Sequence, residues 1–270
     1  MFAFIYSIFV NWGVIITTVP IGYAIRRFKE DIPVIKLRKA FGTIIKDGRG
    51  INISLPIWEA IRKERSEFRF LRNGPDGESE KYYGPDVMIN KNDMIAAKYV
   101  NDIFVDKFRH SPVAYVYDTD KPYLNDTTFI VIGSPKANFH VRYFLDYYPD
   151  SSIKSAANPV LPYKFVDIEE SEATGAKVKI LKTIDGKLFE SDEHKDYGIV
   201  MRIINMHGKY KSNYIFIIAG IHETSTAEAG YMLKSHWKKF VGHAPVKGFL
   251  FEMKRGHEYT GKIIDDSTKI

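Results

Sequence analysis

The stretch "YIFIIAGIHETSTAEAGYML", Tyr214 to Leu233, holds the pattern that decides the fold. An apolar run stops at Gly220, passes through small polar residues and resumes with helix-like spacing. Such a run is typical of a strand that is buried on both faces of a sheet. The hydroxyl residues 224–226 are of the kind that caps the start of a helix. The stretch therefore predicts a central β-strand, a polar loop and a helix.

The same alternation recurs along the chain. Strand-like segments lie at residues 113–118, 128–134, 177–184, 196–206 and 247–254, with a late strand or tail at 258–266, and helical segments at 92–108, 138–148 and 225–240. Asp185-Gly186 is a hairpin signal. Residues 51–71 are typical of a short extended piece followed by a charged amphipathic helix from about Pro56. Strands that alternate with helices predict an α/β fold with a Rossmann-like, largely parallel sheet flanked by helices.

The N-terminal segment from Phe2 to Ile25 has no charged side chain. A helix of that length spans roughly 36 Å, which is enough for a hydrocarbon core about 30 Å thick. Because positive charges follow the segment, the positive-inside rule places the N-terminus outside the cell. We predict a transmembrane helix at 2–25, a basic juxtamembrane linker at 26–50 and a cytoplasmic α/β nucleotide-binding domain at 51–270. A buried hairpin helix is the alternative for the apolar segment.

Composition narrows the partners and the chemistry. The chain has no cysteine, which excludes disulfides, thiolate metal sites and cysteine nucleophiles. Its net charge is +6, and much of the local excess follows the apolar segment. That position favours a lipid bilayer, here the inner membrane, over a nucleic-acid polymer as the anionic partner. The histidines lack metal-ligand spacing, so we predict no metal site and no cofactor.

The first candidate site is the loop in "FIVIGSPKANFHVRYFL". In open α/β sheets, ligands bind outside the carboxyl ends of strands, beside helix N-termini that suit phosphate or carboxylate. A tight turn capped by an asparagine, with a solvated lysine, is the structural alternative. The candidate ligand-binding residues here are Gly133, Ser134, Lys136, Asn138 and Arg142.

The second candidate site is the polar loop of the opening stretch. Two such loops in one Rossmann-like sheet would face each other across the same edge. Glu228 lies in the first turns of the following helix and is the candidate catalytic carboxylate. Its structural alternative is stabilisation by the helix dipole alone. The candidate ligand-binding residues here are Gly220, His222, Thr224, Ser225 and Thr226.

The two loops together resemble the nucleoside deoxyribosyltransferase, TIR and SLOG assemblage of nucleotide-handling domains. The resemblance covers roughly residues 128–235. Glu228-Ala229-Gly230 is similar to a Glu-x-Gly motif in which the glutamate attacks or stabilises the ribosyl carbon. The chain departs from the pattern in two places. Ser225-Thr226 replaces the customary Gly-Thr pair, and the ribose-binding aspartate has only Glu223 as a candidate counterpart.

These features predict a membrane-anchored cytoplasmic nucleotide sensor that forms homo-oligomers. One span with a nucleotide-handling domain resembles bacterial membrane effectors of antiviral signalling, which act on the membrane after ligand-driven clustering. An N-glycosidase or ribosyltransferase that uses Glu228 on a nucleoside or NAD-like substrate is the alternative. A membrane scaffold that binds no ligand is a third reading.

Overall fold

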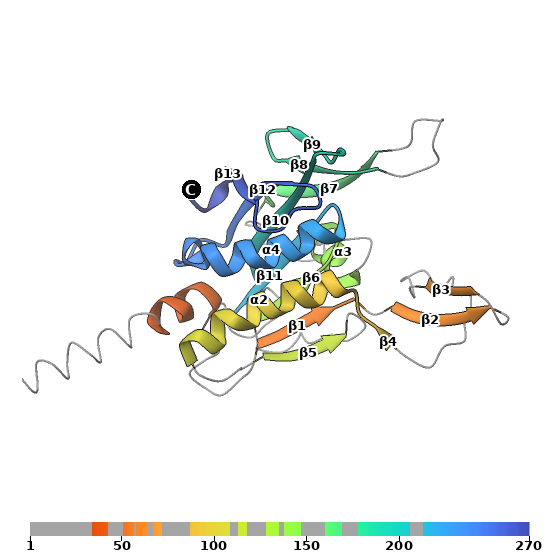
Figure 1. The fold of residues 1–270 in the computed structure, drawn as a ribbon. Helices are drawn as coiled ribbons and strands as arrows, with labels where there is room; N and C mark the ends of the chain where they lie inside the picture. Colours follow the sequence, from red (N-terminus) through yellow and green to blue (C-terminus); the bar gives the residue numbers. More distant parts are fainter. Residues whose placement is uncertain are drawn as a thin grey trace, which may run out of the picture.

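The computed structural model describes the chain from residue 34 onward, with gaps (Figure 1). Within the described residues, no helix combines the length and the apolar character needed to cross a membrane. The predicted span at 2–25 lies outside them. The described residues are 34–42, 51–56, 58–63, 67–71, 87–108, 113–117, 128–134, 138–146, 160–168, 178–205 and 213–269.

A seven-stranded sheet forms the centre of the molecule, in the order β13-β12-β10-β11-β6-β1-β5. Only the neighbouring pairs among β11, β6, β1 and β5 are parallel. The pairs β10–β11, β10–β12 and β12–β13 are antiparallel. The strands are β1 (Ile51–Leu55), β5 (Val113–Tyr117), β6 (Phe129–Ile132), β10 (Lys195–Ile204), β11 (Tyr214–Gly220), β12 (Val246–Lys254) and β13 (Lys262–Asp266).

The prediction of a largely parallel sheet is therefore wrong, and the sheet is mixed. β10 lies between β11 and β12, which run in the same direction because each is antiparallel to β10. β10 also precedes β11 with only a short connection, and parallel pairing needs a crossover of a dozen or more residues. The helix that follows β11 then carries the chain past β10 to β12.

Two smaller antiparallel sheets complete the strands. One has the order β3-β2-β4, from β2 (Trp58–Lys63), β3 (Glu67–Leu71) and β4 (Val87–Met88). The helix predicted from Pro56 is wrong, because Phe68 and Phe70 alternate with charged residues at the period of a strand. The other sheet has the order β7-β8-β9, from β7 (Tyr163–Ile168), β8 (Val178–Thr183) and β9 (Leu188–Glu190). Its β8–β9 turn contains the predicted Asp185-Gly186 signal.

Each face of the central sheet carries its own core. Phe216 and Ile218 of β11 face a core shared with α2 (Lys91–Phe108), α4 (Glu223–His236) and the 3-10 helix η3 (Trp237–Phe240). Ile215 and Ile217 of the same strand face a core shared with α3 (Phe139–Asp146), β7 and β8. The central strand is thus buried on both sides, as the apolar run in its sequence predicts.

A further helix, at residues 34–41, packs into the first core, although the sequence suggested a linker there. Leu37, Ala40 and Phe41 are fully buried. The Phe41 ring stacks on Phe216, with 4.6 Å between ring centroids, and meets Phe104 of α2 edge-on at 5.0 Å. This short helix is therefore part of the folded domain.

Arg202 of β10 holds the helix at residues 34–41 through a hydrogen bond to its backbone. Its side chain is fully buried, and its guanidinium donates hydrogen bonds to the carbonyl oxygens of Ala40, Gly242 and Ala244, at 3.2, 3.1 and 2.9 Å. The guanidinium also lies 4.0 Å from the centroid of the Tyr214 ring. Burial lowers the pKa of Arg202 to about 10, so the group stays charged near neutral pH.

α2 and α4 lie side by side (Figure 1), and Gly230 of α4 faces α2 in close contact. A Cβ atom added at Gly230 of α4 would lie 2.5 Å from the Cα atom and 2.7 Å from the carbonyl oxygen of Ala96 on α2. A salt bridge between Lys234 and Asp102, at 2.9 Å, joins the helices farther along. The two helices therefore pack as one layer.

The substitution Gly230→Ala tests this contact. In a helix without the contact, alanine would stabilise the fold by about 1 kcal/mol through helix propensity. Because the added methyl group meets backbone atoms of α2, we expect instead a loss of roughly 1–3 kcal/mol in the free energy of unfolding. Urea unfolding measures the difference. The exposed position Ser235 of α4, changed to alanine, is the control, and a Gly230→Ala protein as stable as that control would contradict the packing.

Candidate functional site

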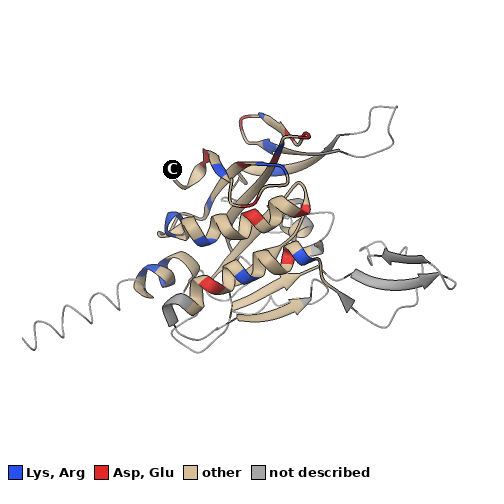
Figure 2. Cartoon of the chain, viewed as in Figure 1, with Lys and Arg blue, Asp and Glu red and all other residues tan. Residues whose placement is uncertain are grey.

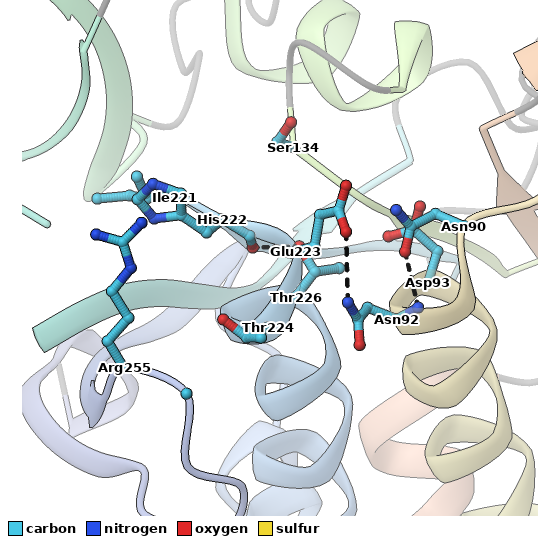
Figure 3. Close-up of a pocket in the computed structure, with 11 residues that line it drawn as sticks. Asn90, Asn92, Asp93, Ser134, Ile221, His222, Glu223, Thr224, Thr226 and Arg255 are labelled. Carbon is cyan, nitrogen blue, oxygen red and sulfur yellow. Dashed lines mark hydrogen bonds between the residues drawn. The ribbon is translucent and has the colours of Figure 1, made fainter. Parts of the chain in front are cut away.

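A cavity of about 590 Å³ opens at the carboxyl edge of the parallel strands (Figure 3). Its walls come from the start of α2, the end of β6, the loop between β11 and α4, and the turn after β12. These segments meet because β12 runs in the same direction as β11, which brings its end to the same edge. The described residues that line the cavity are Asn90, Asn92, Asp93, Ser134, Ile221, His222, Glu223, Thr224, Thr226, Arg255 and Gly256.

One wall, which we call the acidic side, consists of Asn90, Asn92, Asp93 and Glu223. Asn90 caps α2, since its Oδ1 accepts a hydrogen bond from the backbone N–H of Asn92 at 2.7 Å. The Asn92 side chain extends toward α4, where its Nδ2 lies 3.5 Å from Oε2 of Glu223. Acidic residues thus stand in the first turn of both helices (Figure 2), where the helix dipole stabilises negative charge.

Asp93 is the least ordinary residue of this wall. Its side chain is only 4% exposed, yet it borders the cavity, and no residue in the described part of the chain donates a hydrogen bond to its carboxyl group. Burial, together with the negative charge of Glu223, raises the pKa of Asp93 to about 7. Near neutral pH this carboxyl group can therefore either donate or accept a hydrogen bond from a ligand.

The opposite wall, which we call the basic side, consists of His222 and Arg255 (Figure 3). Asp196, fully buried at the start of β10, holds the His222 ring with 3.1 Å between its Oδ1 and Nδ1 of the imidazole. Although burial raises the pKa of Asp196, hydrogen bonds from His222 and Ser191 lower it below the ordinary value. Nη1 of Arg255 donates to the carbonyl oxygen of Asp192 at 2.8 Å. Both side chains are thus held by groups outside the cavity.

The hydroxyl run of the β11–α4 loop mainly shapes the turn. Ser225 Oγ accepts from the N–H of His222 at 3.1 Å and donates to its carbonyl oxygen at 2.9 Å. Thr226 Oγ1 accepts from the N–H of Gly220 at 3.2 Å. A Cβ atom at Gly220 would lie 2.2 Å from Ser225 Oγ, so the turn requires glycine. Thr224 and Thr226 also line the cavity, whereas Gly220 and Ser225 support it from behind.

The other candidate loop contributes one described residue, Ser134, to the cavity. Gly133 turns the chain with a φ of +121°. Asn138 is fully buried and caps α3, since its Oδ1 accepts from the N–H of His140 at 2.8 Å and its Nδ2 donates to the carbonyl oxygen of Ile132 at 2.8 Å. This is the structural alternative that the sequence left open. Lys136 and the side chain of Arg142 lie outside the described residues.

Glu228 is not among the described residues that line the cavity. Its carboxylate accepts hydrogen bonds from two backbone N–H groups of the loop after β12, Tyr259 at 2.7 Å and Gly261 at 2.8 Å. Tyr259 has a φ of +61°, which is unusual for a residue with a side chain. Burial raises the pKa of Glu228, while the two backbone hydrogen bonds lower it. Glu228 therefore fixes the loop that begins with Arg255.

Sequence reasoning missed most of the two walls. Asn92 and Asp93 stand at the start of the helix predicted at 92–108, and the polar run 90–93 was a usable signal. Asp196 and Arg255 gave no signal, because their place at the cavity depends on the directions of β10 and β12. Within the described ranges, no group of three or more His, Asp or Glu side chains could hold a metal ion.

The raised pKa of Asp93 predicts a pH-dependent stability. A carboxyl group whose pKa is raised on folding contributes stability at low pH, and that contribution is lost as the pH rises from about 3.8 through about 7. The substitution Asp93→Asn removes this loss. We expect the stability of Asp93→Asn, relative to wild type, to increase by about 2 kcal/mol between about pH 5.5 and pH 8. Urea unfolding at both pH values measures it. Glu193→Gln, at an exposed surface site, is the control, and the same pH profile in Asp93→Asn and wild type would contradict the burial of this group.

The role of Glu228 can be tested by hydrogen exchange. Glutamine has one acceptor oxygen, so Glu228→Gln leaves at least one of the two loop N–H groups without its partner. Because hydrogen bonds to charged groups contribute roughly 1.5–3 kcal/mol, we expect exchange at residues 259–261 to be about ten to a hundred times faster. Glu258→Gln, in the same loop but exposed, should leave exchange unchanged. Unchanged protection in Glu228→Gln would show that the loop is held by other contacts.

Comparison of the chain with protein-family models, with curated protein sequences and with solved structures found no match.

Proposed function

We propose that this chain is a nucleotide-binding protein and that it binds the nucleoside part of its ligand on the acidic side of the cavity. The observation that carries the proposal is Asp93, a buried carboxyl group without a described hydrogen-bond partner that borders a cavity at the carboxyl edge of the sheet. Burying such a group without a partner destabilises the fold. A ligand that supplies the partner removes that cost.

The chemistry of the acidic side suits a ribosyl ligand. The ribose hydroxyls are hydrogen-bond donors that a carboxylate can accept in pairs, and Glu223 and Asp93 offer two carboxyl groups. Asn90 and Asn92 add side-chain amides, which both donate and accept and so suit the edge of a base. The volume of about 590 Å³ lies within the range of roughly 300–1,000 Å³ that is usual for small-molecule pockets.

A binding screen tests the proposal. The full-length chain, purified in detergent, is heated in the presence of NAD, ADP-ribose, nucleosides, mononucleotides and cyclic nucleotides. A ligand at about a hundred times its dissociation constant adds roughly 2.7 kcal/mol of stability, which is readily seen as a higher melting temperature. We expect at least one ribosyl ligand to stabilise the protein, and Asp93→Asn and Glu223→Gln to weaken that effect. Glu193→Gln should not. If no ligand of the panel stabilised the protein, the proposal would be overturned, and the remaining interpretation would be a membrane scaffold that binds no ligand.

Cleavage of an N-glycosidic bond is the second candidate function, and the pKa of Asp93 favours it. A carboxyl group with a pKa of about 7 is suited to protonate a leaving base near neutral pH. The neighbouring Glu223 would then stabilise positive charge at the ribosyl carbon, the role that the sequence suggested for Glu228, and water would add to that carbon to give the free sugar. Analysis of the ligand after incubation separates the two functions. Recovery of free base and sugar, lost in Asp93→Asn, supports the enzyme, whereas intact ligand supports the sensor.

The sensor proposal extends to the signalling role suggested by the sequence. Membrane attachment through residues 2–25, ligand-driven clustering into homo-oligomers and a part in antiviral defence remain predictions. They share one test with the binding screen, because a ligand found there can be added to the full-length chain in membranes and its clustering measured by cross-linking.

A further inference from the structure

We infer that the phosphate group of the ligand is bound on the basic side of the cavity, by Arg255 and by His222 at the start of α4. The inference rests on the proposed nucleotide-binding function and adds the position of the phosphate and the residues that hold it. His222 belongs to one of the two candidate loops of the sequence analysis, whereas Arg255 lies outside both.

Arg255 offers hydrogen-bond donors in the cavity. Its guanidinium has five N–H donors, and in the described part of the chain the carbonyl oxygen of Asp192 accepts from one nitrogen, Nη1. That bond anchors the exposed side chain at the rim without neutralising its charge. The rigid, planar donor group matches the oxygens of a phosphate.

His222 reaches the cavity from the neighbouring strand end. Its Nδ1 is bound to the buried carboxylate of Asp196, so Nε2 is the ring nitrogen left for a ligand. The Asp196 carboxylate fixes the orientation of the ring, as a carboxylate does behind a metal-bound or catalytic histidine. Asp196 acts through His222 and is therefore a positioning residue.

The start of α4 adds backbone N–H donors to the side chains of Arg255 and His222. His222 is the N-cap of this 14-residue helix, so the first backbone N–H groups of the helix begin next to the imidazole. Such groups have no partner within the helix, and they form the positive end of its dipole. Anions are bound at this kind of position in many proteins.

The negative charges of the cavity lie on the other wall. Glu223 belongs to the first turn of α4, but its carboxylate extends toward Asn92 of α2, away from Arg255 (Figure 3). Asp93 stands on the same far wall, and its pKa of about 7 leaves it partly uncharged near neutral pH. The cavity thus has donors for an anion at one side and acceptors for hydroxyls at the other. A nucleoside phosphate has the complementary order of groups.

Matched ligand pairs test the inference. Binding of adenosine and AMP, guanosine and GMP, cytidine and CMP, and uridine and UMP to the full-length chain is measured by calorimetry at constant ionic strength. We expect the phosphorylated member of the bound pair to bind at least tenfold more tightly, since hydrogen bonds between charged groups correspond to roughly ten- to hundredfold in affinity. Raising the salt concentration should weaken the nucleotide more than the nucleoside.

Two variants assign the effect to residues. Arg255→Met should reduce nucleotide affinity about tenfold or more and leave nucleoside affinity within about twofold. Lys254→Met removes the same charge from the preceding exposed residue, which does not line the cavity, and should change neither affinity. Asp196→Asn should weaken nucleotide binding and alter the ring-nitrogen NMR signals of His222. A purely structural Asp196 would leave those signals and the nucleotide-to-nucleoside ratio unchanged in the folded variant.

The outcomes separate this inference from the proposed function. Equal affinity for nucleoside and nucleotide, unaffected by Arg255→Met, would overturn the phosphate site and leave nucleoside binding in place. No binding by either member of any pair, together with no stabilisation by any ligand of the screening panel, would overturn the proposed function and the phosphate site together.

Discussion

The buried guanidinium of Arg202 is the interaction on which the rest of the domain depends. Its guanidinium donates to the carbonyl oxygen of Ala40 in the helix at 34–41 and to those of Gly242 and Ala244, which follow η3. A buried charge is costly unless its donors are satisfied, so these separate parts of the chain have to meet at one point. At this end of the sheet the charge of Arg202 is thus bound to backbone carbonyl groups. The opposite edge, where the strands lead into loops, is left as the place for polar groups.

The mixed character of the sheet matters for the site as well as for the fold. Because β10 runs against its neighbours, its first residues rather than its last ones lie at the cavity edge. This direction brings Asp196 behind His222. In a wholly parallel sheet the same position would be the end of a strand, followed by a loop. A fully buried carboxylate fixed inside a strand, as here, is a more rigid support for the imidazole than a loop residue would be.

The sequence predicted those features that depend on local pattern. The apolar run of β11 was sufficient to place a central strand, and the polar loop after it does border the cavity through His222, Thr224 and Thr226. Features that depend on pairing between distant segments were missed, because periodicity does not reveal strand direction. Arg255 is the clearest example. For Asn138 and Ser225, the sequence did not distinguish a capping role from a ligand-binding role, because both roles use the same side chains.

The packing of Gly230 against Ala96 has a consequence for the range of ligands that fit. The starts of α2 and α4 both contribute lining residues, so the distance between these helices affects the width of the cavity. The helices meet in close contact at Gly230 and Ala96, about one helical turn from the cavity-lining residues Thr226 and Asp93. The width of the cavity thus depends in part on two small residues that do not line it. Related chains that accept larger ligands would be expected to differ at these positions before they differ in the residues of the walls.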